Sequence, residues 1–346
     1  MMRDMKKILL PLLGLALGLA VTVRAEPLRV IFDTDVGNDV DDALAMAMLH
    51  ALQSRGECQL LAVTLTKDSP YAVAFADVIN TFYGRGGIPI GRVKNGKTPE
   101  PGKFLQAVTE ARDERGALLY PRRLAPDAAV PEAVALLRKT LAAQPDGSVV
   151  LIQVGFFTNL ARLLASRPDE CSPLAGRELV ARKVRFLSAM AGRFNDKKGR
   201  EYNVYIDTPA SQQLCRDWPT PIYFSPWELG DSLKFPAVSI ERDFSYVVHH
   251  PVTDAYRHYM KFPYDRQTWD LTSVLFAVRQ DRGYFTVSEP CRVTVDDQGK
   301  TVLNVDPQGK HYILSATPEQ KARTLETLIL LSSQPPDHLS KGETKP

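Results

Sequence analysis

One stretch of the sequence is the most informative about the fold: Leu28-Arg29-Val30-Ile31-Phe32-Asp33-Thr34-Asp35-Val36-Gly37-Asn38-Asp39-Val40-Asp41-Asp42-Ala43-Leu44. Its first five residues are apolar enough for a buried strand, and a helical pattern begins at Asp41. Five aspartates crowd the turn between these two elements. In an open sheet of parallel strands, ligands bind at the carboxyl ends of the strands. The sequence therefore predicts a functional site at this turn.

Helix capping accounts for only part of this acidic density. Aspartate is favoured at helix N-caps and in first turns, which explains Asp39 or Asp41. It does not explain Asp33, Asp35 and Asp42 together, because close carboxylates repel one another unless they share something positive. Ligands that are all oxygen atoms favour calcium or magnesium over zinc or copper. The turn therefore predicts a site for a hard cation.

The rest of the chain repeats the alternation of strand and helix. Apolar runs predict strands at 28–32, 60–66, 148–154, 184–190 and 221–224, and helical patterns predict helices at 41–52, 71–83, 131–143 and 158–164. Short buried strands that alternate with helices predict one α/β domain over residues 26–331. Its central sheet should be open and mostly parallel, with helices on both faces. Residues 332–346 are rich in Pro, Ser and Lys and are expected to be disordered.

Residues 1–25 have the pattern of a secretory signal peptide. A basic front precedes a 16-residue, mostly apolar run from Ile8 to Val23, and Ala25 offers a small residue for cleavage. The run is shorter than the roughly 20 apolar residues that span a bilayer. The sequence therefore predicts a periplasmic or secreted protein with no membrane attachment after cleavage.

Charge and cysteine content limit the kinds of binding partner and metal site that the chain is expected to have. The signal segment holds four of the 43 basic residues and one of the 40 acidic residues, so the mature chain has 39 of each. This balance gives no electrostatic basis for binding nucleic acid, and it favours a small or weakly charged partner. The four cysteines lack the paired spacing of a zinc or redox site, and the sequence does not choose a disulfide among them. It also does not decide between a monomer and a homo-oligomer.

Two known metal-dependent patterns resemble part of the acidic turn. An EF-hand loop that starts at Asp33 needs Gly at its sixth position and Glu at its twelfth, but Asn38 and Leu44 stand there. A haloacid-dehalogenase-like phosphatase also opens with a strand and an Asp-x-Asp pair, which would make Asp33 the nucleophile and Asp35 the acid. This alternative leaves the Asp-Asp pair that follows without a role.

A third pattern fits the acidic turn better. Asp33-Thr34-Asp35-x-Gly37, followed closely by Asp41-Asp42-Ala43, resembles the N-terminal signature of inosine-uridine-type nucleoside hydrolases. Further segments resemble the family's motifs in the family's order: Val154 to Leu160, Met190 to Gly192 with Asn195, Glu201 to Ala210, and Trp269 to Thr272. The resemblance runs from about Arg29 to Ser315. It implies hydrolysis of the N-glycosidic bond of ribonucleosides to free base and ribose.

The resemblance also implies residue roles. The calcium ion would be held by Asp35, Asp42, Asp270 and the backbone carbonyl of Val154. A water bound to that calcium would attack the sugar, after Asp35 or a neighbouring carboxylate takes its proton. The ribose would be bound by Asp41 and Asn203 at the 2′ and 3′ hydroxyls, by Glu201 and Asn195 towards the 3′ and 5′ side, and by the segment that begins at Met190.

Three departures from the family pattern leave questions open. Asn38-Asp39-Val40 is two residues longer than the commonest spacing, so Asp39 could take the role of Asp35 or Asp41. Where relatives have Gly-Asn, this chain has Thr66-Lys67-Asp68, so that a ribose contact is lost or is supplied by Asp68.

The third departure is Trp269, which occupies the place of a histidine that many relatives use to protonate the leaving base. An indole does not ionise near neutral pH, but its face can stack on a purine. The candidate catalytic residues are therefore Asp35, Asp41 and Trp269. A competing interpretation is an exported protein that only binds a nucleoside or a sugar and has lost catalysis.

Overall fold

The computed structural model describes residues 26–195 and 199–340. A central sheet runs in the order β11-β10-β12-β6-β5-β4-β1-β2-β3, with β9 paired to β12. Its strands are β1 (Leu28–Thr34), β2 (Cys58–Lys67), β3 (Ile90–Lys97), β4 (Val149–Gln153), β5 (Val184–Met190), β6 (Ile222–Ser225), β9 (Thr286–Val287), β10 (Cys291–Val295), β11 (Thr301–Val305) and β12 (His311–Ser315). The strands from β3 to β12 along this path pair in parallel, whereas β10 pairs antiparallel with both β11 and β12.

Strand β1 lies at the point where the strand order reverses. It pairs on one side with β2, the next strand in the chain, and on the other side with β4. Asp33 is opposite Thr64 of β2 and opposite Gln153 of β4. The chain therefore leaves a crevice beyond the carboxyl end of β1, which is the topological switch point where open α/β sheets bind ligands.

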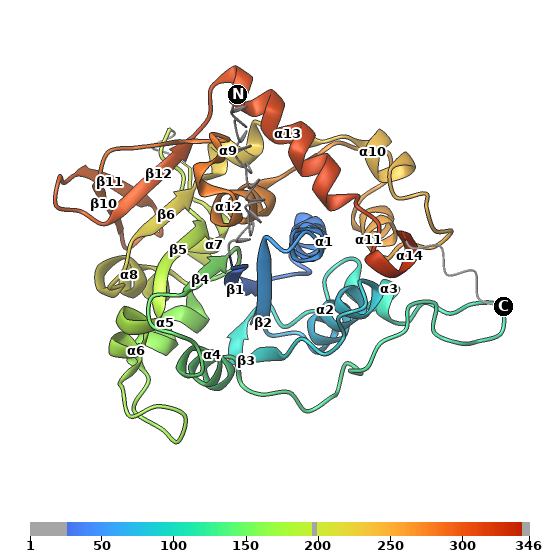
Figure 1. The fold of residues 1–346 in the computed structure, drawn as a ribbon, viewed down its shortest axis with the longest axis horizontal. Helices are drawn as coiled ribbons and strands as arrows, with labels where there is room; N and C mark the ends of the chain where they lie inside the picture. Colours follow the sequence, from blue (N-terminus) through green and yellow to red (C-terminus); the bar gives the residue numbers. More distant parts are fainter. Residues whose placement is uncertain (1–25, 196–198, 341–346) are drawn as a thin grey trace, which may run out of the picture.

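Helices cover both faces of the sheet, as Figure 1 shows. One face carries α1 (Asp41–Ser54), α2 (Pro70–Phe82), α12 (Trp269–Val278) and α13 (Pro318–Ser332), and the other carries α4 (Ala133–Ala142), α5 (Thr158–Ala165), α6 (Gly176–Lys183) and α8 (Thr208–Asp217). Alternating side chains of β1 feed the two cores: Val30 and Phe32 pack with the first group, and Ile31 packs with the second. This alternation is what a strand buried on both faces requires.

Shorter elements surround these layers. They are α3 (Leu105–Thr109), α7 (Tyr202–Ile206), α9 (Trp227–Asp231), α10 (Ala237–Arg242), α11 (Pro251–Tyr259), α14 (Asp337–Ser340), the 3₁₀ turn η1 (Gln280–Arg282), and the two-stranded sheet of β7 (Lys234–Phe235) and β8 (Arg266–Gln267). Among the described residues, none of the helices is long and apolar enough to cross a membrane.

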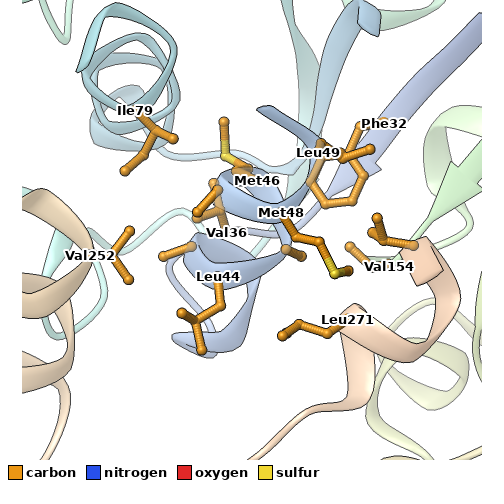
Figure 2. Close-up of a cluster of buried hydrophobic side chains, with 14 of the residues drawn as sticks. Phe32, Val36, Leu44, Met46, Met48, Leu49, Ile79, Val154, Val252 and Leu271 are labelled. Atoms are coloured by element: carbon orange, nitrogen blue, oxygen red, sulfur yellow. The ribbon is translucent and has the colours of Figure 1, made fainter. Parts of the chain in front are cut away.

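Helix α1 is buried on every side. All residues from Asp41 to Leu52 are shielded from solvent. Figure 2 shows this helix inside a ring of apolar side chains, with Phe32 from β1, Ile79 from α2, Val252 from α11 and Leu271 from α12. Contacts all round the helix fix its axis, and therefore fix the position of the two aspartates in its first turn.

The predicted fold class is confirmed, and the predicted elements lie within about three residues of the observed ones. The sequence did not predict β3 or the antiparallel strands β10, β11 and β12. The chain after Ser332 was expected to be disordered, but it forms α14, where Asp337 accepts a hydrogen bond of 2.8 Å from the Ser54 hydroxyl. The predicted signal peptide and residues 341–346 lie outside the described residues.

Candidate active site

The crevice at the switch point contains a cavity of about 360 Å³. Its walls come from the ends of several elements: Asp35 follows β1, Asp41 and Asp42 begin α1, Val154 follows β4, Met190 ends β5, Glu201 and Asn203 lie at the start of α7, and Asp270 lies in the first turn of α12. Eleven residues, Trp269 among them, were predicted from the sequence to form the site, and all of these except Asn195 and Asp68 line this cavity.

Two glycines allow the chain to pack closely here. A Cβ atom on Gly155 would lie 2.6 Å from the backbone nitrogen of Asp35 and 2.4 Å from the hydroxyl oxygen of Thr66, so no larger residue fits between β1 and β4. Gly37 has φ +110°, a conformation that favours glycine, and its Cβ would clash with Leu105. The Gly positions of two of the sequence motifs thus have a steric cause.

Three carboxylates form a compact group. Asp41, Asp42 and Asp270 each offer an oxygen within 4.8 Å of the others, and all three are buried. Oδ1 of Asp42 accepts a hydrogen bond from the Thr34 hydroxyl, while its buried Oδ2 has no hydrogen-bond partner among the described residues. Buried anionic oxygens that lack donors fit a hard divalent cation, which binds oxygen ligands.

This group differs in part from the predicted metal ligands. Asp42 and Asp270 belong to both sets, but Asp41 is in the compact group and Asp35 is not. Asp35 still lines the same cavity, close enough to raise the pKa of Asp42 by repulsion. The carbonyl of Val154 accepts a hydrogen bond of 2.9 Å from the Asn203 amide. The difference at Asp41 follows from its place on α1, directly before Asp42 and facing the Asp270 backbone N–H, from which it accepts a 3.0 Å hydrogen bond.

The acidic groups are poorly hydrated. Burial raises the pKa of Asp33 and Asp35 to about 7. Burial and then repulsion among the aspartates raise the pKa of Asp41, Asp42 and Asp270 well above the usual range. A bound cation favours the ionised forms, so the cluster couples cation binding to proton release.

Asp39 has a different partner. Its carboxylate forms a bidentate ion pair with the Arg266 guanidinium, in which Nε lies 3.0 Å from Oδ1. The same guanidinium lies over the rings of Tyr259 and Trp269, at 5.1 and 5.0 Å from the centroids. Asp39 therefore lines the cavity as part of a charge pair, and the longer turn does not displace Asp35 or Asp41 from it.

Glu201 and Asn203 form one wall of the cavity. Glu201 caps α7: its carboxylate accepts hydrogen bonds from the backbone N–H groups of Asn203 at 2.8 Å, Val204 at 3.1 Å and Gly192 at 3.3 Å. Burial nevertheless raises its pKa to about 7. The Asn203 amide, besides its contact with Val154, donates to the Met190 carbonyl at 3.1 Å. These bonds fix the orientation of both side chains.

Two predicted sugar-binding residues lie elsewhere. Asn195 is exposed, and its backbone N–H is bound by the Glu228 carboxylate rather than facing the cavity. Asp68 accepts a hydrogen bond of 2.9 Å from the backbone N–H of Gly96, and it lies 3.9 Å from the Arg92 guanidinium. Both partners of Asp68 lie in β3, and neither Asp68 nor Asn195 lines the cavity.

An aromatic rim closes the other side. Trp269 lines the cavity as predicted, and its indole N–H donates to the Trp227 carbonyl at 3.0 Å. Trp227, Tyr202 and Tyr259 also line the cavity and were not predicted. Trp227 lies just beyond the carboxyl end of β6, a position that the strand-end rule could have identified, whereas Tyr259 ends α11 and has no local signal. No histidine lines the cavity among the described residues.

The phosphatase alternative needs Asp33 as an accessible nucleophile. Asp33 is completely buried and does not line the cavity. Its Oδ1 accepts hydrogen bonds from the Thr64 hydroxyl at 2.6 Å and from the Asn159 amide at 2.8 Å. These contacts give Asp33 a structural role in joining β1, β2 and α5, and they argue against that alternative.

Comparisons with known proteins agree with this geometry. Residues 30–328 match the family model described as inosine-uridine preferring nucleoside hydrolase. A comparison with curated protein sequences returned no match. Among solved structures, a plant nucleoside hydrolase superimposes with a TM-score of 0.67 at 19% identity, covering 89% of this chain and 100% of that one.

Two bacterial structures are similar to the same extent. A purine-preferring ribonucleoside hydrolase from Gardnerella vaginalis has a TM-score of 0.67 at 17% identity, covering 90% of this chain and 99% of that one. An inosine-uridine preferring nucleoside hydrolase from Bacillus anthracis has a TM-score of 0.64 at 19% identity, covering 88% and 99%. Likeness at this identity establishes the fold, and the family match over nearly the whole described chain establishes membership. The protein belongs to the inosine-uridine preferring nucleoside hydrolase family.

Proposed function

We propose that the protein hydrolyses the N-glycosidic bond of ribonucleosides, with calcium in the acidic cluster. The observation that carries this proposal is the composition of the cavity. Its lining combines carboxylates, Glu201 among them, with the Asn203 amide and the aromatic rings of Tyr202, Trp227, Tyr259 and Trp269. Its volume of about 360 Å³ lies within the range of roughly 300–1,000 Å³ that is usual for small-molecule sites.

The carboxylates supply two parts of the chemistry. A divalent cation in the cluster would lower the pKa of the hydrolytic water. Asp35 is the candidate for the base that takes the proton from this water, because it lines the same cavity as the three grouped carboxylates without belonging to that group. The other ionised aspartates stabilise the positive charge that develops on the ribose ring as the glycosidic bond breaks.

The wall residues suit a neutral sugar. Glu201, Asp41 and the side-chain oxygen of Asn203 can accept hydrogen bonds from ribose hydroxyls, while the Asn203 N–H groups donate to the Val154 and Met190 carbonyls. A phosphate would be repelled by so many carboxylates. This supports an unphosphorylated riboside as the substrate.

The rim suits a flat leaving group. Trp227 and Trp269 lie with ring centroids 6.3 Å apart and planes inclined by 32°. Neither indole can donate a proton as an acid near neutral pH, so the leaving base must be protonated by another group or by water, or leave without protonation. A base held against Trp269 by stacking would be a purine in preference to a pyrimidine, because a purine offers the larger face.

The protein is proposed to act in the periplasm or outside the cell. The basic and apolar pattern of residues 1–25 supports export. Mass spectrometry of protein purified from an export-competent host would test this proposal. A mature chain that begins near Glu26 is expected, and retention of Met1 in that host would refute it.

The activity itself is tested by incubating the purified protein with a panel of ribonucleosides and nitrophenyl riboside, with calcium or with EDTA, and measuring released reducing sugar. Calcium-dependent release from at least one riboside is expected, and Asp35→Asn should abolish it. Phosphomonoesters with magnesium are the matched control for a phosphatase. Binding of a nucleoside by calorimetry without any release of sugar would identify a binding protein and refute the proposed hydrolysis.

A further inference from the structure

Lys67 is a charged residue in an unusual place. Its side chain is completely buried at the end of β2, beside the acidic cavity but not in its lining. Its ammonium donates to the Asn38 side-chain oxygen at 2.8 Å and to the Thr98 carbonyl at 2.9 Å. The Glu100 carboxylate is 4.0 Å away. Burying an ammonium costs free energy unless its hydrogen bonds are satisfied, and here these contacts satisfy them. Because lysine is rarely buried, a buried lysine beside the cavity suggests a specific role.

The contact with Lys67 determines which way the Asn38 amide faces. An ammonium can only donate, so the oxygen of this amide must point towards Lys67. The amide nitrogen must then point the other way, where it donates to Oδ2 of Asp35 at 2.8 Å and to the Thr98 hydroxyl at 3.2 Å. Lys67 thereby turns Asn38 into a donor that faces the carboxylate of Asp35.

Thr98 shows that the local backbone is built around this arrangement. It has φ +50°, in the left-handed region that β-branched residues rarely adopt. From this conformation its carbonyl accepts from Lys67 while its hydroxyl accepts from Asn38. A strained residue that contacts both neighbours indicates that the structure enforces their geometry.

We propose that Lys67 is a positioning residue that acts through Asn38 to hold the Asp35 carboxylate in the orientation needed for proton transfer. The inference rests on the proposed function, because it assigns Asp35 as the base. The bond to Asn38 occupies Oδ2 of Asp35 and leaves Oδ1 for the water. The two extra residues of the turn, seen in the sequence as a departure from the family pattern, thus supply the positioning amide.

A simpler role for Lys67 is to offset the negative charge of the cluster. Its ammonium does interact electrostatically with Asp35 and Asp42. That role needs no Asn38, so the two explanations predict different behaviour when both residues are changed. If Lys67 acts through Asn38, its loss should have no further effect once Asn38 is gone. If it acts only as a charge, the two losses should be independent.

The test compares Lys67→Met, Asn38→Ala and the double variant, each as the full chain with calcium and the best riboside. Each single change should lower kcat by roughly 10-fold or more, since a hydrogen bond to a charged group is lost, and should change KM little. The double variant should be no slower than the slower single variant. Asp68→Asn is the matched control, because this neighbour of Lys67 accepts a hydrogen bond from Gly96 and does not line the cavity. It should retain wild-type kcat.

A second measurement does not depend on activity. The side-chain amide of Asn38 can be observed by ¹⁵N NMR and assigned by its absence in Asn38→Asp. Slow exchange of its protons is expected in the wild-type protein, and fast exchange in Lys67→Met. If the wild-type protein hydrolyses no riboside, the proposed function fails while this spectrum still tests the orientation of Asn38. An unchanged Asn38 signal in Lys67→Met, or effects on kcat that multiply in the double variant, would overturn the inference.

Discussion

Removing the divalent cation should destabilise the protein at pH 8 far more than at pH 5. In the unfolded chain, Asp33 and Asp35 ionise near pH 4, but in the fold without a cation their pKa is about 7. Between these values the folded protein holds protons that the unfolded chain has released. The stability of the cation-free protein therefore falls as the pH rises from about 4 to about 7, and it stays low above pH 7.

The size of this effect can be bounded from the structure. A carboxyl group that ionises near pH 7 instead of near pH 4 loses on the order of 4 kcal/mol of stability at pH 8. The aspartates interact, so their losses do not add, and we take one such group as the scale. A cation at about 1,000 times its dissociation constant returns ~4 kcal/mol. In a domain of this size each kcal/mol of stability moves Tm by roughly 2 °C. The expected difference in Tm between the protein with calcium and the protein with EDTA at pH 8 is therefore about 8 °C.

Thermal unfolding followed by circular dichroism, with calcium or with EDTA at each pH, measures this difference. Calcium should raise Tm clearly at pH 8 and hardly at pH 5. Asp42→Asn should lose the calcium-dependent rise, while Asp39→Asn should keep it, because Asp39 is paired with Arg266. Equal melting temperatures at pH 8 with EDTA, calcium and magnesium would refute the assignment of the cluster as a cation site.

Three further predictions concern the substrate and the mature chain. Asn203→Ala should lower kcat/KM roughly 30-fold, which corresponds to about 2 kcal/mol of transition-state stabilisation, because a contact with the sugar is lost. Equal rates on ribosides and 2′-deoxyribosides would contradict a role of Asn203 in recognising the hydroxyls. Trp269→Phe should retain most activity on purine nucleosides, whereas Trp269→Ala should slow them more than nitrophenyl riboside; full activity of both folded variants would exclude Trp269 from the site. A chain produced from Glu26 onwards should bind calcium as tightly in calorimetry as the exported product, since the described cavity contains no earlier residue.

The sequence predicts the centre of the sheet well and its edge poorly, for a physical reason. Strands β1, β4 and β5 are buried on both faces and appear as continuous apolar runs. Strand β11 has mostly exposed residues although three of its five residues are apolar, so it shows no alternation of buried apolar and exposed polar positions. Strand β3 contains two glycines and several polar residues, so its sequence shows no clear alternation of apolar and polar positions.

At the site, the predicted residues that lie together are those whose geometry is local. Asp35, Asp41 and Asp42 lie close together because a strand and a buried helix follow directly upon one another. Asp68 and Asn195 do not line the cavity, because their orientation depends on partners distant in sequence. Tyr259 was not predicted for the same reason, since only the tertiary fold brings α11 to the crevice.

The burial of helix α1 has a consequence for how the cavity exchanges its contents. A helix packed on all sides cannot tilt or unwind without opening the core, so the backbone amides of α1 should be among the last in the chain to exchange hydrogen. The aspartates on its first turn therefore cannot withdraw to admit a substrate or release a product. Tyr202, Trp227 and Tyr259 of the lining lie instead on the short helices α7, α9 and α11. Any movement that admits a substrate is therefore expected in these short helices and not in α1.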